Sequence, residues 1–230
     1  MTTDPATEPY RRTTRDHVVE ALREMLFTGR FAPGEPIREQ EIAVAVGASR
    51  GPVREAMIQL SAEGLLRFDR YRGNAVIDPD LDDVRELLTM RGALEGFAAG
   101  LAAAKPDRAL LAELNQRVAQ MRQASENENR SAFFDLDLDF HRTVVRMADH
   151  RVLLETWAQV RNRFALSARL VISDLYDSHD QLVGLAERHQ ALVDPIESGD
   201  VDLARRRSED HPLDALRRYE LKRSKQRSAW

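Results

Sequence analysis

Apolar side chains recur at helical spacing through most of this chain, and one stretch near residue 70 alternates as a β-ribbon does. An apolar stripe predicts a first helix near residues 13–28, which ends at Gly29. The pattern then predicts a short helix, a tight turn at Gly47, a second helix after Ser49, and two strands, LLRFD and NAVID. Beyond residue 80 it predicts only helices, near residues 81–104, 107–124, 130–148, 151–172, 180–198 and 200–222.

The segment Asp78-Pro79-Asp80 separates these two patterns. Proline ends the preceding strand and aspartate often caps a helix, so a domain boundary and hinge are expected here. The sequence therefore predicts a mainly α fold, with a winged helix-turn-helix domain over residues 10–78 and an all-α helical bundle over residues 79–225. Within the first domain, the segment APGEPIREQE is predicted to be a turn.

Composition bears on the cellular compartment more than on the fold. The chain has 230 residues, enough for two modest domains, and no cysteine, which excludes disulfides and thiolate metal sites. It has no apolar run of the ~20 residues that span a bilayer. The segment MTTDPATEPY also lacks the apolar core of a signal peptide. A cytoplasmic protein without membrane contact is expected.

The second helix of the first domain has two arginines near its N-terminal end. Arg50 and Arg54 are four residues apart and share a face, away from the predicted inward face. A helix-turn-helix reads DNA with this end of its second helix, and the planar guanidinium grips guanine or phosphate bidentately. The alternative is an ordinary solvated face, in which Glu55 or Glu63 pairs with the arginines. Residues 10–72 hold 11 basic and 9 acidic side chains, so DNA binding would depend on local placement of charge.

The blocks EIAVAVGASRGPVREA, LSAEGLL and RGNAV lie between residues 41 and 76. Together they resemble the DNA-binding domain of GntR-type bacterial transcription regulators. The resemblance implies double-stranded operator DNA as the partner, with Arg72 and Gly73 at the wing tip. One departure is Gly51, where the family more often has threonine, so a hydroxyl donor is lost. The implied DNA-contacting residues are Arg38, Gln40, Ser49, Arg50, Gly51, Arg54, Arg72 and Gly73.

The predicted bundle places several ionisable side chains on inward faces. Asp137 and His141 are four residues apart on one apolar stripe, His189 lies on another, and His211 lies on a less apolar one. Because an unpaired buried imidazole or carboxylate is costly, these groups need partners. Three imidazoles and a carboxylate suit a divalent metal ion such as Zn²⁺ or Ni²⁺. The alternative is a hydrogen-bonded core in which Asp137 and His141 form an intrahelical pair.

The run Asp137-Leu-Asp-Phe-His141, followed by two later histidines, resembles the FCD-type effector domain of the FadR class of GntR regulators. The resemblance implies a metal ion held by Asp137, His141, His189 and His211, with water or an effector carboxylate completing the shell. Two prolines depart from a regular helix. Pro195 is predicted to interrupt its helix, and a kink at Pro212 leaves the direction of His211 open.

Arg91 lies within the apolar stripe of the first bundle helix, and a buried guanidinium requires an anion. One candidate is Glu95, four residues later. The other is the carboxylate of a small organic acid effector, because the run Met90-Arg-Gly-Ala-Leu-Glu95 resembles the family's first effector-domain helix. In that case Arg91 and a bound metal ion would hold the acid at two points.

These observations favour a transcription regulator, and repression is the commoner outcome in such families. One winged helix covers only a half-site, so a homodimer on a palindromic operator is expected. An enzyme is not expected, although a metal-dependent hydrolase using the Asp/His site is the alternative from another class. Against that alternative, the chain has no H-E-x-x-H motif. A third possibility is a regulator whose metal ion is purely structural.

Overall fold

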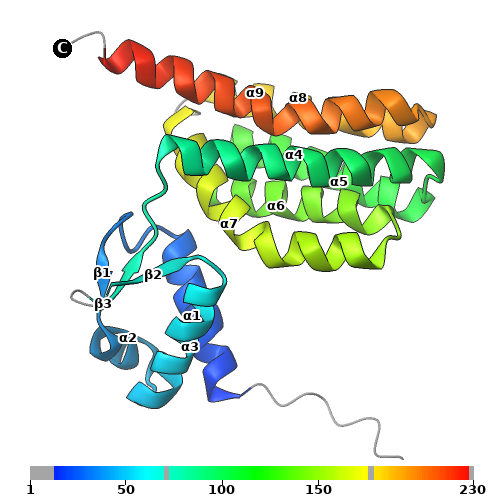
Figure 1. The fold of residues 1–230 in the computed structure, drawn as a ribbon. Coiled ribbons are helices and arrows are strands. Elements are labelled where there is room, and N and C mark those ends of the chain that lie inside the picture. Colours follow the sequence, from blue (N-terminus) through cyan, green and yellow to red (C-terminus); the bar gives the residue numbers. More distant parts are fainter. Residues whose placement is uncertain (1–12, 70–72, 176–178, 228–230) are drawn as a thin grey trace, which may run out of the picture. The chain divides into compact units, whose positions relative to one another are not determined.

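The computed structural model describes residues 13–69, 73–175 and 179–227. The chain divides into two compact units at the junction of Asp78 and Pro79. Figure 1 colours the chain along its sequence and labels the elements of each unit. Within the described residues, no helix is both long and apolar enough to cross a membrane.

The N-terminal unit combines three helices with a small sheet. Its elements are α1 (Thr14–Phe27), β1 (Pro36–Ile37), α2 (Glu39–Val46), α3 (Arg50–Ala62), β2 (Leu66–Asp69) and β3 (Gly73–Val76). The sheet has the order β1-β3-β2, and both pairings are antiparallel. The turn predicted before α2 is wrong in one respect, because two of its residues form β1. A strand of two residues is too short to leave a periodic signal.

Local sequence explains the turns of this unit. Thr13 forms a capping box with Asp16 at the start of α1. Gly47 ends α2 with a φ of 65°, which a glycine adopts without strain and which allows the tight turn into α3. Val53, Met57 and Leu60 are buried on the inner face of α3, as the helical spacing predicts.

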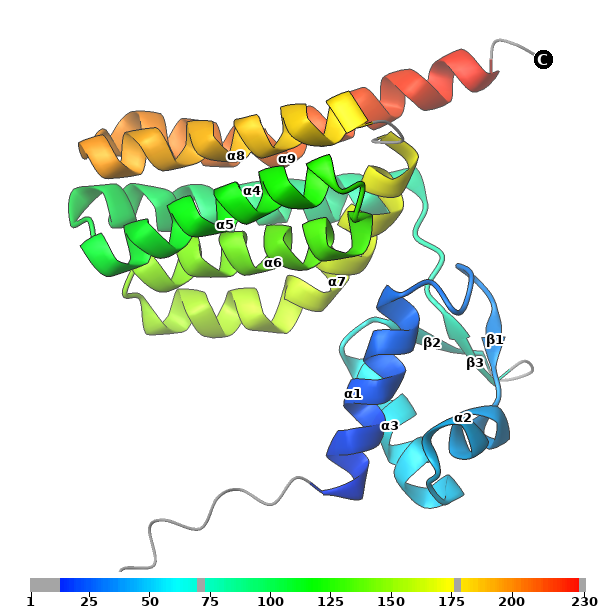
Figure 2. The same cartoon turned by 180° about the vertical axis from the view of Figure 1, so that it is seen from behind.

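The C-terminal unit is a bundle of helices. They are α4 (Leu81–Ala104), α5 (Arg108–Glu126), α6 (Arg130–Met147), α7 (Arg151–Leu175), α8 (His179–Ser198) and α9 (Val201–Arg227). Helix α4 contacts α6, α7, α8 and α9, and Figure 2 shows α5 between α6 and α8. A continuous apolar core fills the space between them. The mainly α fold predicted from the sequence is confirmed.

The interruption predicted at Pro195 is wrong, since α8 continues through this residue. A proline has no N–H, so the carbonyl of Ala191, four residues earlier, loses its partner within the helix. The guanidinium of Arg207 on α9 donates to that carbonyl at 2.7 Å. Helix α9 likewise continues through Pro212. The substitute hydrogen bond therefore holds α8 together where local propensity predicts a break, and packing keeps α9 continuous where it predicts a kink.

Two glycines of α4 allow α9 to approach closely. A Cβ atom on Gly92 would lie 2.6 Å from the backbone oxygen of Glu209, and one on Gly96 would overlap the Glu209 side chain. Neither position has room for a methyl group without movement. The missing side chains therefore set the distance between α4, which carries Arg91, and the part of α9 that carries His211.

Candidate DNA-binding face and metal centre

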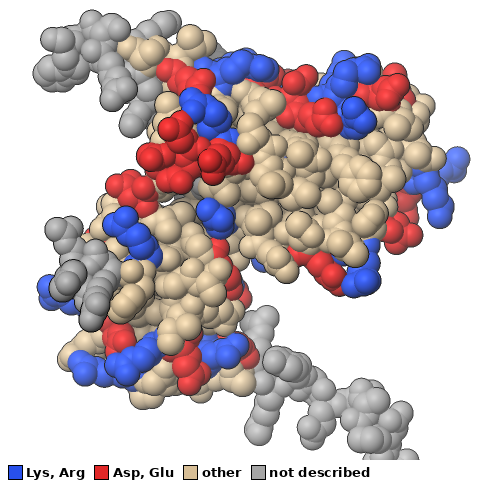
Figure 3. All heavy atoms as spheres, in the orientation of Figure 1, with Lys and Arg blue, Asp and Glu red and all other residues tan. Residues whose placement is uncertain are grey.

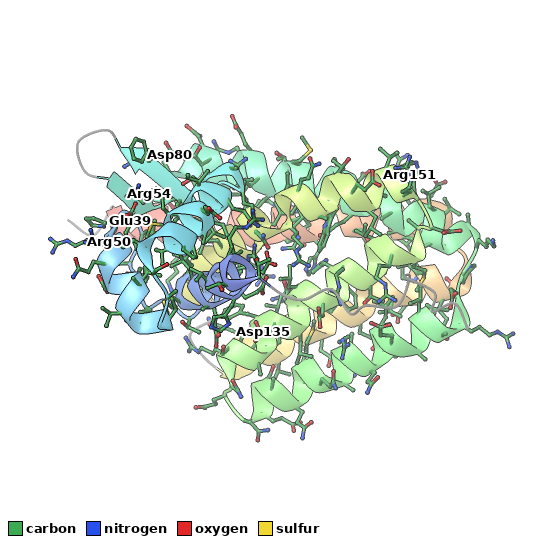
Figure 4. All side chains as sticks on the ribbon, turned by 90° about the horizontal axis from the view of Figure 1, so that it is seen from below. Glu39, Arg50, Arg54, Asp80, Asp135 and Arg151 are labelled. Carbon is green, nitrogen blue, oxygen red and sulfur yellow. The ribbon has the colours of Figure 1, made fainter. Side chains whose placement is uncertain are left out.

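Six of the eight implied DNA-contacting residues are exposed on or beside α2 and α3: Arg38, Gln40, Ser49, Arg50, Gly51 and Arg54. Figure 4 labels three side chains of this region, Glu39, Arg50 and Arg54, which gather on one side of the N-terminal unit. Gly73 begins β3, where it pairs with Asp69. Arg72 lies outside the described residues.

Both arginines of α3 have partners on α2. Arg54 donates to Glu39 from Nε at 2.8 Å and from Nη2 at 2.9 Å, while Arg50 donates to the Gln40 carbonyl oxygen. The alternative pairing with Glu55 or Glu63 is not the one found, because the partners are Glu39 and Gln40, and Glu63 pairs with Arg23 of α1. A hydrogen bond from Arg54 lowers the pKa of Glu39. These bonds span 10 and 15 residues, so helical spacing within α3 gives no sign of them.

Ser49 occupies the N-cap position of α3 but makes no side-chain capping bond. A serine cap accepts from the second or third N–H of its helix, and the third residue here is Pro52, which has none. The first turn of α3 also has no acidic residue. This helix N-terminus, with Arg50 beside it, is suited to an anionic phosphate group.

The described residues of the N-terminal unit form no continuous basic surface on the side drawn in Figure 3, as expected if contact with DNA depends on a few local side chains. On the side drawn in Figure 3, basic and acidic side chains alternate along the N-terminal unit. We propose that recognition of DNA depends on the short row of side chains at the start of α3.

Gly51 offers a direct test of this face. A Cβ atom there meets nothing within 4 Å. We expect Gly51→Thr to fold as the wild type does and to bind operator DNA about fivefold more tightly, through one added hydrogen bond of roughly 1 kcal/mol. Fluorescence anisotropy with labelled operator DNA measures this. Gly51→Ala is the control, since it adds the methyl group without the hydroxyl. Equal affinities for the threonine and alanine variants would exclude the hydroxyl contact.

In the C-terminal unit, the four implied metal ligands come together from three helices. Asp137 and His141 lie on α6, His189 on α8 and His211 on α9, and one donor atom from each lies within 4.8 Å of the others. Asp137 Oδ1 is 2.9 Å from His189 Nε2 and 3.7 Å from His141 Nε2. The two Nε2 atoms are 3.3 Å apart. The ring of His211 lies 4.7 Å from that of His189, so Pro212 does not turn His211 away.

The Nδ1 atoms of His141 and His189, on the side of each ring away from the centre, have hydrogen-bond partners of their own. His141 Nδ1 is 2.8 Å from Glu95 Oε2, and His189 Nδ1 is 2.9 Å from the carbonyl of Leu185. Each acceptor favours a proton on Nδ1, so with an ion bound between the two rings their Nε2 lone pairs would be the donors directed at it. Metal-binding histidines are commonly held in this way.

Arg91 is 6% exposed and lies among carboxylates. Its Nε donates to Glu95 at 3.0 Å, and its Nη2 is 3.6 Å from Asp137 Oδ2. Glu95 was one of the two anions expected for Arg91, and it is the partner found. Sequence reasoning missed Trp157 of α7, whose indole N–H also donates to Glu95, at 3.2 Å. A tryptophan on an apolar stripe carries no sign of this contact.

The pKa values follow from burial and these neighbours. Burial acts to raise the pKa of Glu95, but Arg91 and His141 outweigh it and lower the pKa to about 2. Asp137 is likewise buried, yet His141 and His189 hold its pKa well below the usual range. Burial lowers the pKa of His189 and, with the neighbouring imidazoles, places that of His211 well below its usual value. Glu95 and Asp137 outweigh burial and raise the pKa of His141. The Asp137 carboxylate and at least two neutral imidazoles thus face the centre at neutral pH, in the protonation states that bind metal ions.

Comparison with known proteins agrees with this architecture. The family model "Bacterial regulatory proteins, gntR family" matches residues 14–76, and the FCD domain model matches residues 86–215. A probable D-xylose utilization operon transcriptional repressor of Paenarthrobacter nicotinovorans is 34% identical over 198 residues, covering 84% of this chain and 85% of the relative. The transcriptional repressor RspR of Escherichia coli strain K12 is 29% identical over 212 residues, covering 91% of this chain and 86% of RspR.

Two solved structures share the fold. E. coli McbR/YncC superimposes with a TM-score of 0.77 at 19% identity, over 91% of this chain and 98% of that one. A putative GntR regulator from Rhodococcus sp. RHA1 gives 0.74 at 25% identity, over 89% and 96%. A helix-turn-helix unit followed by this bundle defines a DNA-binding transcription regulator and not an enzyme, as predicted. The chain belongs to the GntR family of bacterial regulators and contains an FCD domain.

Proposed function

We propose that this chain is a metal-dependent repressor whose affinity for operator DNA is controlled by a small organic acid. The observation that carries the proposal is the buried cluster of Asp137, His141, His189 and His211, with the Nε2 atoms of His141 and His189 directed at each other. Such a donor set suits Zn²⁺ or Ni²⁺. When bound, the ion would supply a Lewis-acidic coordination position for an effector oxygen.

The charges in this site favour an anionic effector. With the histidines neutral, as metal binding requires, the charged side chains buried in this site are Arg91, Glu95 and Asp137, which leave one excess negative charge. A divalent ion would convert this to one excess positive charge, and an uncompensated buried charge is costly. The carboxylate of a small acid would neutralise it, with Arg91 as its second point of attachment.

Thermal unfolding tests the sensory half of the proposal. We expect a chelator to lower the unfolding midpoint, and one acid from a panel to raise it only in protein loaded with Zn²⁺ or Ni²⁺. At 100 times its dissociation constant, a ligand of the folded state contributes about 2.7 kcal/mol. Arg91→Ala should abolish the effect of the acid. Arg85→Ala, at an exposed position of the same helix, should keep it.

The outcome separates this proposal from a purely structural metal ion. If chelation unfolds the bundle while no acid changes stability or operator affinity, the metal ion is structural. If chelation changes nothing, the His/Asp cluster is core packing, and the DNA-binding assignment stands without a metal.

We also propose that the protein acts as a homodimer. One α3 helix contacts one half-site, so two copies are needed for a palindromic operator. Met90 and Phe97, two turns apart on α4, are 52% and 48% exposed and offer apolar surface for pairing. Sedimentation equilibrium should give twice the 26.2 kDa chain mass, and a monomer that binds operator DNA with full affinity would exclude pairing. Operator binding also supports the expected cytoplasmic location, where the DNA is accessible.

A further inference from the structure

Glu95 connects three helices at the candidate metal centre. It is 1% exposed, and both of its carboxylate oxygens are bonded. Oε2 is 2.8 Å from His141 Nδ1 on α6. Oε1 accepts from Arg91 Nε on α4 at 3.0 Å and from Trp157 Nε1 on α7 at 3.2 Å. One side chain thus contacts a candidate metal ligand, the candidate effector-binding arginine and the core of a further helix.

We infer that Glu95 is a positioning residue, which fixes the imidazole of His141 for metal binding and links the metal centre to α7 through Trp157. This inference rests on the proposed metal centre. It goes beyond that proposal by assigning a role to a residue that donates nothing to the ion itself.

The two well-oriented histidines differ in how they are held. His189 is held by the backbone carbonyl of Leu185, which no side-chain substitution removes. His141 depends on a carboxylate, which can be replaced. Outer-shell partners of this kind fix the tautomer and ring orientation of a ligand, and losing one typically weakens metal binding about 10- to 100-fold. His141 is therefore the ligand whose geometry is most sensitive to a change at Glu95.

The Glu95 carboxylate also links the candidate metal centre to the indole of Trp157. Its indole is 1% exposed, and its N–H donates to the oxygen that Arg91 also contacts. A positive charge placed at His141 would draw electron density from Glu95 and change the field at the indole. The fluorescence of Trp157 should therefore report the occupancy of the metal centre. The chain has two tryptophans, so the measurement is made in a Trp230→Phe background.

Glu95→Gln tests the inference, because the amide keeps the size of the carboxylate but loses its charge and one acceptor. We expect the affinity for Zn²⁺, measured by competition with a chromophoric chelator, to fall about 10- to 100-fold. We also expect ¹⁵N NMR of the metal-free protein to show His141 losing its preference for a proton on Nδ1, while the spectrum of His189 stays as in the wild type. The Trp157 response to Zn²⁺ should shrink in parallel.

Two control variants separate positioning from general damage. Trp157→Phe leaves the contact between Glu95 and His141, so its Zn²⁺ affinity should stay within about threefold of the wild type. Glu155→Gln makes the same chemical change at an exposed position of α7 and should alter none of the readouts. A merely structural role would lower the unfolding temperature of Glu95→Gln without changing the His141 tautomer.

A double variant covers the case in which Glu95→Gln does not fold. Arg91→Met with Glu95→Gln removes both members of the buried Arg91–Glu95 pair, and Asp137 keeps its contacts with His141 and His189. It should bind Zn²⁺ about 10- to 100-fold more weakly than Arg91→Met alone. Unchanged Zn²⁺ affinity and an unchanged His141 tautomer on loss of Glu95 would overturn this inference alone. Failure of the wild type to bind Zn²⁺ would instead overturn the proposed function.

Discussion

Replacing both Arg50 and Arg54 by alanine is expected to lower operator affinity by at least roughly 30-fold, because each contact contributes about 1–3 kcal/mol. The loss has a second cause in Arg54. Its guanidinium neutralises Glu39 through two hydrogen bonds, so its removal leaves an unpaired carboxylate on the face proposed to meet DNA phosphates. Electrophoretic mobility shift with DNA from upstream of the protein's own gene measures the change.

The matched control for this double variant lies on the other unit. Arg122 makes a similar two-bond pair with Glu187 at the surface of the bundle. Arg122→Ala should leave operator binding unchanged within about threefold, since a surface substitution of this kind costs less than 0.5 kcal/mol. Binding of the Arg50/Arg54 double variant at the affinity of the Arg122 control would contradict the assignment of α3 as the reading helix.

Gly92→Ala is expected to damage the candidate metal centre without touching any ligand. The new methyl group would lie 2.6 Å from the backbone oxygen of Glu209, so α9 must move away from α4. Overpacking of this kind costs about 1–3 kcal/mol of stability. The shift also carries His211, two residues after Glu209, away from the other ligands. Zinc affinity should fall, and the unfolding midpoint should fall in metal-free protein too.

Gly100 provides the control on the same helix and the same side. A Cβ atom there would lie 3.7 Å from the Arg205 Cβ, an ordinary contact distance. Gly100→Ala should therefore be neutral or stabilise the helix by up to about 1 kcal/mol, since alanine is the better helix former. Calorimetry with and without Zn²⁺ compares the two variants. Equal zinc affinity in both would show that the spacing of α4 and α9 does not govern the position of His211.

The sequence predicts much of the fold because each helix has a local signature. Leu81–Ala104 matches the predicted helix 81–104, since Asp80 caps its start and the proline after Lys105 excludes continuation. The strand β1 could not be predicted, because its two residues are held by β3 and not by their own pattern. The break predicted at Pro195 is wrong for a related reason. Its missing hydrogen bond is replaced by Arg207, which is 16 residues away from the accepting carbonyl.

The candidate DNA-binding and metal sites show the same difference between local sequence signals and contacts that are distant in the sequence. The inward-facing histidines were found from spacing and resemblance because burial leaves a periodic mark. Glu39 and Trp157 were missed, because their roles depend on contacts 15 and 62 residues away in the sequence. Ser49 precedes α3 as the sequence predicts, and its lack of a capping bond agrees with Pro52, which has no N–H to donate.

The hydrogen bond from Arg207 to the Ala191 carbonyl has a consequence for the entropy of ion binding. Helix α8 carries His189 and helix α9 carries His211, so this bond joins two helices that carry candidate metal ligands without involving those ligands. Donors that are already ordered lose less conformational freedom when an ion arrives. Because Pro195 has no N–H, the Ala191 carbonyl can accept from Arg207 on α9. This bond orders His189 and His211 in advance and would lower the entropic cost of binding an ion between them. Restoring the helical bond with Pro195→Ala would give that carbonyl a second donor and loosen the tie between the two imidazoles.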